Sequence, residues 1–431
     1  MKMLLVAACC VPFLAGQPAD DTQLRQVIIF GRHAVRTPNA ANAILNNFSA
    51  LPYPNFAVPG LAVITPNGQK NETILGAYFR LWLTQERLLT GRDAADNASV
   101  YFRADGAPLI VDTAQAFAAG MLPSAAAAIH STTSSDPLFH PVDAGVAQLD
   151  EPMAVAAVNG RLGGNPQALA TAYAPEMALV RSVLFNYPPG TTPVPATPAG
   201  KIDLTAAPFT VTAGSSALPV NLGGLQNIAI ALDPFIMEYT DGMAASDVGW
   251  GQLNAAGISQ IDRLYDRVLD LEFRTPYLAR VQNSNLASHI VRSMVQAATG
   301  SPVTGALGAP SDKAIVLTAS NFNITGLAGL LGLEWLVPGY QADVAAPGGA
   351  LVFELRQSQT TGEFIVRTVY ITQTMDQLRN RTPLTLTSPP AVAPVFVPGC
   401  STGNATFDCP LEAFVEVVTG AIDPRSIDLN Q

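Results

Sequence analysis

QVIIFGRHAVRTP, residues Gln26–Pro38, is the segment around which the chain is predicted to be organised. Its apolar run Val27–Phe30 is typical of a short strand that is buried on both faces of a mostly parallel sheet. After one glycine, the run is followed by Arg32, His33 and Arg36. Open α/β sheets bind their ligands at the carboxyl ends of the strands, so we expect these three side chains at that edge.

The order of these residues favours a site for a tetrahedral oxyanion. Each guanidinium can donate two parallel hydrogen bonds to such an anion, and a neutral imidazole between them can attack its central atom. The bare pattern R-H-x-x-R is also compatible with an ordinary strand end and a solvated basic turn. The full string R-H-x-x-R-x-P is more specific, and it favours an anion site in which His33 is the nucleophile.

RHAVRTP resembles the signature of the histidine acid phosphatases, in the branch that includes bacterial phytases and glucose-1-phosphatases. In that family the histidine becomes a phosphohistidine and the arginines hold the phosphate, which implies these roles for His33, Arg32 and Arg36. We expect no cofactor, and His140 has no partners at a spacing typical of metal ligands. The resemblance covers nearly the whole mature chain, and further familiar segments are TPNG (65–68), TAQAFAAGMLP (113–123), SDPLFHP (135–141), VGWG (248–251), LVPGY (336–340), PGGALVFE (347–354) and CPLEAF (409–414).

The resemblance breaks in the second half of the site. The family has a Gly-His-Asp step at a strand end, and the matching residues here are Ala319–Asn321. The phosphate-binding histidine is thus replaced by Ser320, and the aspartic acid that protonates the leaving group is replaced by Asn321. A third arginine of the family corresponds to Leu109, and a Thr-Lys pair of the phytases corresponds to Asn39–Ala40.

These replacements predict weak or atypical catalysis. Losing one preorganised charge-stabilising donor costs ~10²–10³ in rate, and losing a general acid costs ~10²–10⁴, although the two effects do not simply add. Two classes of function stay open. One is a hydrolase that uses His33 on a substrate with a good leaving group or low charge. The other is a non-catalytic protein that binds an anion, but such a protein has no need for a histidine between the arginines.

Other polar residues are candidates for substrate binding. Arg103 lies two residues before Asp105 on an expected strand, so both side chains point to one face, and Arg103 could take the place of the missing arginine. The resemblance matches Asp105 and Asp233 to substrate-contacting acids, and either is a candidate for the missing proton donor. The expected substrate-binding set is Asn39, Arg103, Asp105, Asp233, Ser320 and Asn321.

Composition limits the possible partners. The chain has 431 residues, 13% of them charged and 48% hydrophobic, which predicts a compact fold of two domains or one domain with an insertion. Its formal net charge of −10 argues against nucleic acid and against an anionic membrane surface. The expected partner is a small, phosphate-like anion, and the sequence does not predict an oligomeric state.

The first residues and the cysteines predict export. One lysine and an apolar run at Met3–Leu14 are typical of a secretory signal, which we place at residues 1–19. The run is too short to span a bilayer, and it is also short for a lipidation site at Cys9. Cys400 and Cys409 then remain, and such a pair indicates a disulfide in a periplasmic or secreted protein. Two free thiols or half of a zinc site are alternatives that lack supporting ligands nearby.

The expected fold is α/β, with a mostly parallel central sheet covered by helices on both faces and an inserted, mainly helical subdomain. The α/β domain is expected at residues 20–143 and 266–431, and the insertion at 144–265. Turn and periodicity signals predict strands at 99–105, 313–319, 350–356 and 363–372, and helices at 71–89, 113–119 (capped by Asp112), 254–273, 286–298 and 324–333.

Overall fold

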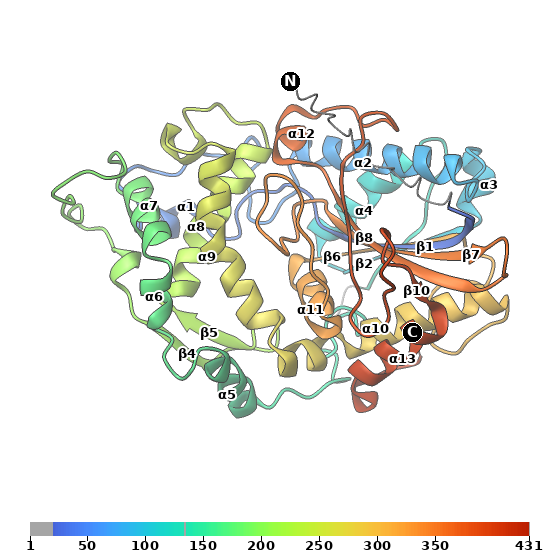
Figure 1. Ribbon diagram of the computed structural model, residues 1–431. Helices are drawn as coiled ribbons and strands as arrows, with labels where there is room; N and C mark the ends of the chain where they lie inside the picture. Colours follow the sequence, from blue (N-terminus) through green and yellow to red (C-terminus); the bar gives the residue numbers. More distant parts are fainter. Residues whose placement is uncertain (1–19, 133–134, 431) are drawn as a thin grey trace, which may run out of the picture.

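The computed structural model describes residues 20–132 and 135–430, so the predicted signal peptide lies outside the described residues. Its centre is an eight-stranded sheet with the order β10-β8-β7-β1-β6-β2-β3, and β9 pairs with β8 (Figure 1). The strands are β1 Thr22–Arg32, β2 Val100–Ala104, β3 Ile129–His130, β6 Ala314–Ala319, β7 Ala350–Ser358, β8 Phe364–Thr372, β9 Ala391–Pro394 and β10 Cys409–Pro410.

The sheet is mixed, and its strands are mostly parallel. β1 pairs in parallel with β6, β6 with β2, and β2 with β3. β7 runs antiparallel to β1 and β8 runs antiparallel to β7, so β1, β2, β3, β6 and β8 all point the same way. The predicted fold class is therefore confirmed, and β7 and β8 form an antiparallel hairpin.

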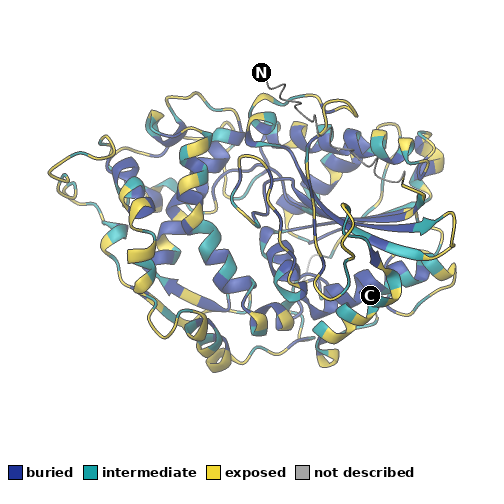
Figure 2. Ribbon diagram, viewed as in Figure 1, coloured by how far each residue is buried: buried dark blue, intermediate teal, exposed yellow. Residues whose placement is uncertain are grey.

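Both faces of β1 are covered, as its continuous apolar run predicts. Val27 and Ile29 pack in one cluster with residues of α2 and α4. Ile28 and Phe30 point the other way and pack in a cluster with residues of α10, α11 and α13. Figure 2 shows the resulting layer of buried strands between the helices. These helices are α2 Pro66–Gln85, α4 Pro108–Met121, α10 Pro276–Thr299, α11 Asn321–Leu331 and α13 Leu411–Ala421.

The mainly helical part lies beside the sheet in Figure 1. We propose the division into an α/β domain and an insertion at 144–265, with α9 running across its second boundary. The elements of this part are α5 Glu151–Arg161, α6 Ala168–Ala172, α7 Ala174–Leu184, α8 Gly224–Thr240, α9 Ala255–Phe273 and the strand pair β4 Phe209–Ala213 and β5 Val220–Gly223. Short helices elsewhere are α1 Asn42–Leu45, α3 Asp93–Asn97 and α12 Met375–Asn380, and single 3₁₀ turns occupy 204–206, 248–251 and 424–426.

Several helices begin earlier than the sequence patterns predict. α4 begins at Pro108, so Asp112 lies inside the helix and does not cap it. α10 begins at Pro276 and α2 at Pro66, because proline at the first helical position has a suitable φ and loses no hydrogen bond. The predicted Cys400–Cys409 disulfide is present, with the two Cα atoms 5.2 Å apart. None of the described helices is long and apolar enough to cross a bilayer.

Candidate active site

The end of β1 brings Arg32, His33 and Arg36 together at the carboxyl edge of the sheet. The main-chain N–H of His33 donates to the carbonyl of Ala319 on β6 at 2.9 Å, and that of Arg32 donates to Gly349 before β7 at 2.9 Å. These bonds fix the backbone of the segment between two neighbouring strands. The three side chains are 4%, 5% and 2% exposed, so the guanidiniums and the imidazole lie in a largely water-free environment.

His33 is held in the tautomer that a nucleophile needs. Its Nδ1 lies 3.0 Å from the carbonyl oxygen of Ala34, so Nδ1 carries the proton and donates it there. Nε2 therefore has the lone pair, and no hydrogen bond to it is found in the described part of the chain. Burial, together with the neighbouring Arg32 and Arg36, lowers the pKa of His33 well below its usual value. The imidazole is neutral at physiological pH, and its Nε2 can attack an electrophile.

The two arginines present unused donors. Arg32 donates from Nη1 to the carbonyl of Ala345 at 2.6 Å. Arg36 forms a two-pronged ion pair with Asp233, at 2.9 Å from Nη1 and 2.8 Å from Nη2. The Nε–H groups of both arginines are buried and have no partner among the described residues. An unsatisfied buried donor is costly, and an anion bound between the two guanidiniums would satisfy both.

Asp233 and Asn39 sit on the far side of Arg36. Burial alone would raise the pKa of Asp233, but the charge and hydrogen bonds of Arg36 hold it below the ordinary aspartate value. The main-chain N–H of Asn39 points to the same carboxylate, at 3.5 Å. Asp233 is therefore an ionised partner of Arg36 in this structure, and Asn39 is placed here by its backbone.

Ser320 and Asn321 follow β6 and begin α11. Ser320 donates from Oγ to Oδ1 of Asn323 at 2.9 Å, so its hydroxyl serves the start of the helix. Asn321 donates from Nδ2 to the phenol oxygen of Tyr265 at 3.2 Å. Burial raises the pKa of Tyr265 to about 12, and the nearby Asp233 adds to the effect. The phenol is thus neutral, and its own proton is not used in this bond.

α9 contributes residues that sequence reasoning missed. A small cavity beside Arg32 and Asp233 is lined by Tyr265, Asp262 and Asp266 of this helix. Burial raises the pKa of Asp262 to about 8, and it also raises the pKa of Asp266. The carboxyl of Asp262 is therefore mainly protonated at neutral pH. The sequence does show polar residues on the buried side of this amphipathic helix, but no local feature of the sequence indicates that they lie near the end of β1.

Similarity to known proteins identifies the family to which the chain belongs. The model of the histidine phosphatase superfamily (branch 2) matches residues 23–188. The solved structure of Hafnia alvei phytase in complex with tartrate is similar with a TM-score of 0.85 and 30% identity, over 96% of this chain and 100% of that one. The chain belongs to the histidine phosphatase superfamily. Phytase AppA of Escherichia coli (strain K12) is 28% identical over 97% of this chain and 99% of its own length. A glucose-1-phosphatase of Providencia rettgeri is 24% identical over 98% and 99%.

Membership of this histidine phosphatase superfamily supports phosphate-ester hydrolysis as the general activity, and it confirms the resemblance of RHAVRTP. The position that the resemblance assigns to a third arginine is Leu109, which is buried with Ala34 and Ile64 in a small apolar cluster. Among the described residues, no group of three or more His, Cys, Asp or Glu side chains is arranged to hold a metal ion.

Arg103 does not fill the place of that arginine in this structure. Its Nε and Nη2 donate to the carboxylate of Asp136 at 3.0 and 2.7 Å, and Asp136 is fully buried. A buried carboxylate that lost this partner would be left uncompensated, which holds the guanidinium where it is. The expectation that Arg103 turns toward Leu109 is therefore corrected by its ion pair with Asp136.

Asp105 forms a pair that the sequence did not predict. Nε2 of His140 lies 2.8 Å from Oδ2 of Asp105, and Nδ1 of His140 lies 3.9 Å from Asp143. The hydrogen bond with Asp105 raises the pKa of His140 above the ordinary histidine value. Asp105, which follows β2, and His140, in the loop 139–143, thus form a hydrogen-bonded pair, and both line the same pocket as Ser320.

Proposed function

We propose that the protein is an exported phosphatase that cleaves phosphate esters or anhydrides through a phosphohistidine on His33, and only where the leaving group departs without a proton. The observation that carries this proposal is the state of His33. Its Nδ1–H is bonded to the Ala34 carbonyl, and its Nε2 has no partner among the described residues. Its neighbours Arg32 and Arg36 each have an unused Nε–H donor.

The chemical steps follow from this geometry. The phosphoryl oxygens bind to the two guanidiniums, which neutralise charge on the transferring group. Nε2 of His33 attacks phosphorus, the N–P bond forms, and the P–O bond to the leaving group breaks with its electron pair on that oxygen. The positive charge that develops on the ring is spread toward Nδ1–H and the Ala34 carbonyl. Water then attacks phosphorus, the N–P bond breaks, and phosphate leaves with the two protons of that water.

The restriction on the leaving group follows from Asn321 and Ser320. An amide can donate a hydrogen bond to a departing oxygen but has no proton to release, and the Asn321 amide already donates to Tyr265. The Ser320 hydroxyl donates to Asn323. An alkoxide has a strong need for a proton as it departs, whereas an aryl oxide, an acyl oxygen or a phosphate does not. Alkyl phosphates such as phytate and sugar 6-phosphates are therefore expected to be nearly inert.

The experiment is a rate series over leaving-group pKa. The purified mature protein is assayed with aryl phosphates, acetyl phosphate, pyrophosphate, a sugar 6-phosphate and phytate. We expect kcat/KM to fall steeply as leaving-group pKa rises, and His33→Ala to abolish every rate. His130→Gln is the matched control, because His130 is exposed on β3, and it should leave the series unchanged. The double variant Ser320→His/Asn321→Asp should flatten the series.

Rapid hydrolysis of phytate by the unmodified protein would contradict the proposal. A different residue would then supply the proton, and Asp105 and Asp233 are the first candidates from the sequence. Activity that survives in His33→Ala would contradict the phosphohistidine itself.

The alternative function is an anion-binding protein without catalysis. It is favoured by the Arg36–Asp233 ion pair, which already neutralises one of the two guanidiniums before any ligand arrives. Phosphate binding without turnover of any member of the series would support this alternative.

For location, we propose the periplasm or the exterior, since disulfides such as Cys400–Cys409 are typical of oxidising compartments. N-terminal sequencing of the mature protein tests this proposal.

A further inference from the structure

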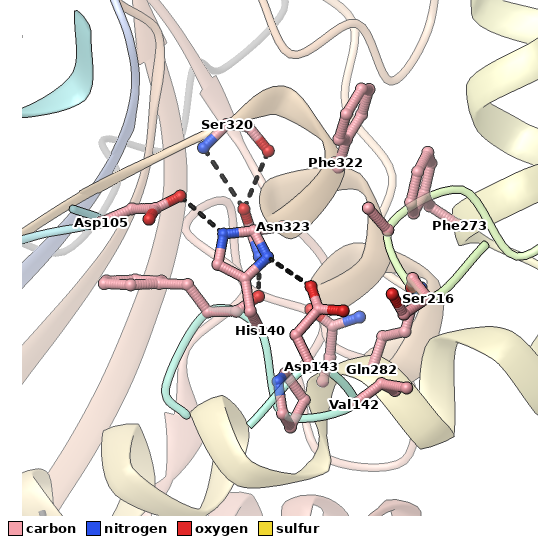
Figure 3. Close-up of a pocket in the computed structure, with 14 residues that line it drawn as sticks. Asp105, His140, Val142, Asp143, Ser216, Phe273, Gln282, Ser320, Phe322 and Asn323 are labelled. Carbon is pink, nitrogen blue, oxygen red and sulfur yellow. Dashed lines mark hydrogen bonds and ion pairs between the residues drawn. The ribbon is translucent and has the colours of Figure 1, made fainter. Parts of the chain in front are cut away.

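Figure 3 shows a second hollow, whose lining residues include Asp105 and Ser320. It has a volume of about 160 Å³. Its walls come from the end of β2, the loop 139–143, the turn between β4 and β5, the end of α9, the middle of α10 and the start of α11. We call it the ring pocket, and its apolar lining residues are Phe139, Pro141, Val142, Ala217, Phe273 and Phe322.

The ring pocket begins at the strand ends that hold the nucleophile. His33 is hydrogen-bonded through its main-chain N–H to Ala319 at the end of β6, and the next residue, Ser320, lines the pocket. Asp105 also lines it, and its N–H donates to Thr318 of the same strand at 3.0 Å. Because β1, β6 and β2 are neighbours that end in register, the hollow lies at the same edge of the sheet as His33. We infer that it can receive a group attached to a phosphate on His33.

The pocket walls suit an aromatic ring. Phe273 and Phe322 are stacked on each other, with ring centroids 4.6 Å apart and planes inclined by 10°. The volume is close to the ~150 Å³ of an engineered apolar cavity that binds benzene. Several polar groups of the wall already have partners, because Ser320 bonds to Asn323, Asn323 bonds to Phe139, and His140 bonds to Asp105. The side-chain oxygen of Asn283, which also lines the pocket, is buried and has no partner among the described residues.

The carboxylates that line the pocket disfavour the binding of a polyanion. Asp105 and Asp143 line it, His140 is the only cationic side chain among the lining residues, and no arginine or lysine is present there. A ligand that carried further phosphate groups into this space would meet two carboxylates with little compensation. An uncharged, apolar leaving group avoids this cost and gains from burial.

We propose that the ring pocket binds the aromatic ring of the leaving group, so that the substrates are aryl phosphate monoesters. This inference rests on the proposed function and deepens it. The pKa of a phenol is ~10, so a phenoxide can leave without being protonated. It therefore does not need the proton that Asn321 is unable to donate. The loss of the proton donor and the apolar pocket therefore select the same class of substrate from two independent parts of the site.

The test separates binding of the ring from chemistry at His33. Phenylphosphonate and methylphosphonate have the same anionic group and no cleavable ester, and their affinities are measured by calorimetry. Burying one ring predicts that phenylphosphonate binds about 10- to 100-fold more tightly. For catalysis, 4-nitrophenyl phosphate is compared with acetyl phosphate, whose acetate leaving group also departs without a proton but has no ring.

Ala217→Trp is the main variant, because Ala217 lies on an exposed turn, where a larger side chain can be accommodated and would fill the pocket. We expect the ratio of kcat/KM for 4-nitrophenyl phosphate over acetyl phosphate to fall at least tenfold, and the preference for phenylphosphonate to disappear. Phe322→Leu, which removes one aromatic wall, should lower both the kcat/KM ratio and the preference for phenylphosphonate. Ala213→Trp on β4, also exposed, is the matched control and should change neither.

Equal affinities for the two phosphonates in the unmodified protein would overturn the proposal, as would an unchanged ratio in Ala217→Trp. If acetyl phosphate is hydrolysed and aryl phosphates are not preferred, the proposed role of the ring pocket is wrong, but the proposed function still holds. If neither 4-nitrophenyl phosphate nor acetyl phosphate is cleaved, the proposed function fails, and the phosphonate affinities alone decide whether the pocket binds a ring.

Discussion

Replacing Glu238 with glutamine should change how the stability of this protein depends on pH. Glu238 lies in α8 and is fully buried. One carboxyl oxygen, Oε2, accepts the N–H of Gly249 at 3.0 Å, and the other, Oε1, has no partner among the described residues. Burial raises the pKa of Glu238 from 4.5 to about 8, and Asp247 adds to this, although the bond from Gly249 opposes it. The native state therefore holds a proton on this carboxyl at neutral pH.

The sign of the effect follows from proton binding. Between pH 4.5 and 8 the native state keeps the proton and the unfolded state releases it, so the free energy of unfolding falls as pH rises through that range. From pH 5 to pH 7, this one group is expected to remove about 2–3 kcal/mol of stability. Glutamine has the same shape, accepts the Gly249 bond and does not titrate. Glu238→Gln should thus have about the same stability as the unmodified protein near pH 5 and gain about 2–3 kcal/mol relative to it at pH 7.

The assay is urea-induced unfolding at pH 5, 6 and 7 for both proteins. Glu416→Gln is the matched control, because Glu416 is exposed on α13, and its curve should follow that of the unmodified protein. Burial also raises the pKa of Glu72 and of Glu272 to about 8, so a residual slope is expected in Glu238→Gln. Parallel pH curves for Glu238→Gln and the unmodified protein would refute the reasoning, since the carboxyl would then be ionised in the folded state.

Two further predictions concern the disulfide and the anion site. Thiol titration of the unfolded, unreduced mature protein should find no free sulfhydryl, and Cys400→Ser/Cys409→Ser should cost about 2–3 kcal/mol of stability; two titratable thiols would contradict this. Phosphate bound at Arg32 and Arg36 should raise the melting temperature, because at a hundred times its Kd it adds about 2.7 kcal/mol to the free energy of unfolding. Arg36→Ala should abolish that rise, whatever its basal stability, and Arg25→Ala, at an exposed position on β1, should retain it. A rise that persists in Arg36→Ala would place the anion elsewhere.

The parts of this protein that the sequence predicts well are those encoded locally. The apolar run Val27–Phe30 can only be accommodated with both faces covered, and the structure buries all four residues. The adjacency of Arg32, His33 and Arg36 to that run is covalent, so a correct strand brings them to the sheet edge without further information. The tautomer of His33 is likewise local, because its partner is the carbonyl of the next residue.

The parts that were not predicted depend on contacts between distant segments. Tyr265 and Asp262 belong to a helix whose periodicity fixes its buried face but not which strand end that face covers. The ion pair of Arg103 joins a strand residue to Asp136 in a loop that has no periodic pattern. The early start of α4 at Pro108 is different in kind. Pro108 itself indicates a helix start, but the prediction gave more weight to Asp112, which resembles an N-cap residue.

The charge balance of the site supports the proposal that the enzyme selects its substrates by their leaving group. Arg32 and Arg36 contribute two positive charges, the ionised Asp233 cancels one, and His33 and Asp262 are neutral at physiological pH. A phosphate dianion bound there remains only partly compensated, so this site cannot rely on charge to stabilise the transferring group to the extent that three arginines and a second histidine would allow. Under the proposed function, activity then requires a bond that breaks with little assistance, and binding energy from an uncharged part of the substrate would compensate for the weak anion site.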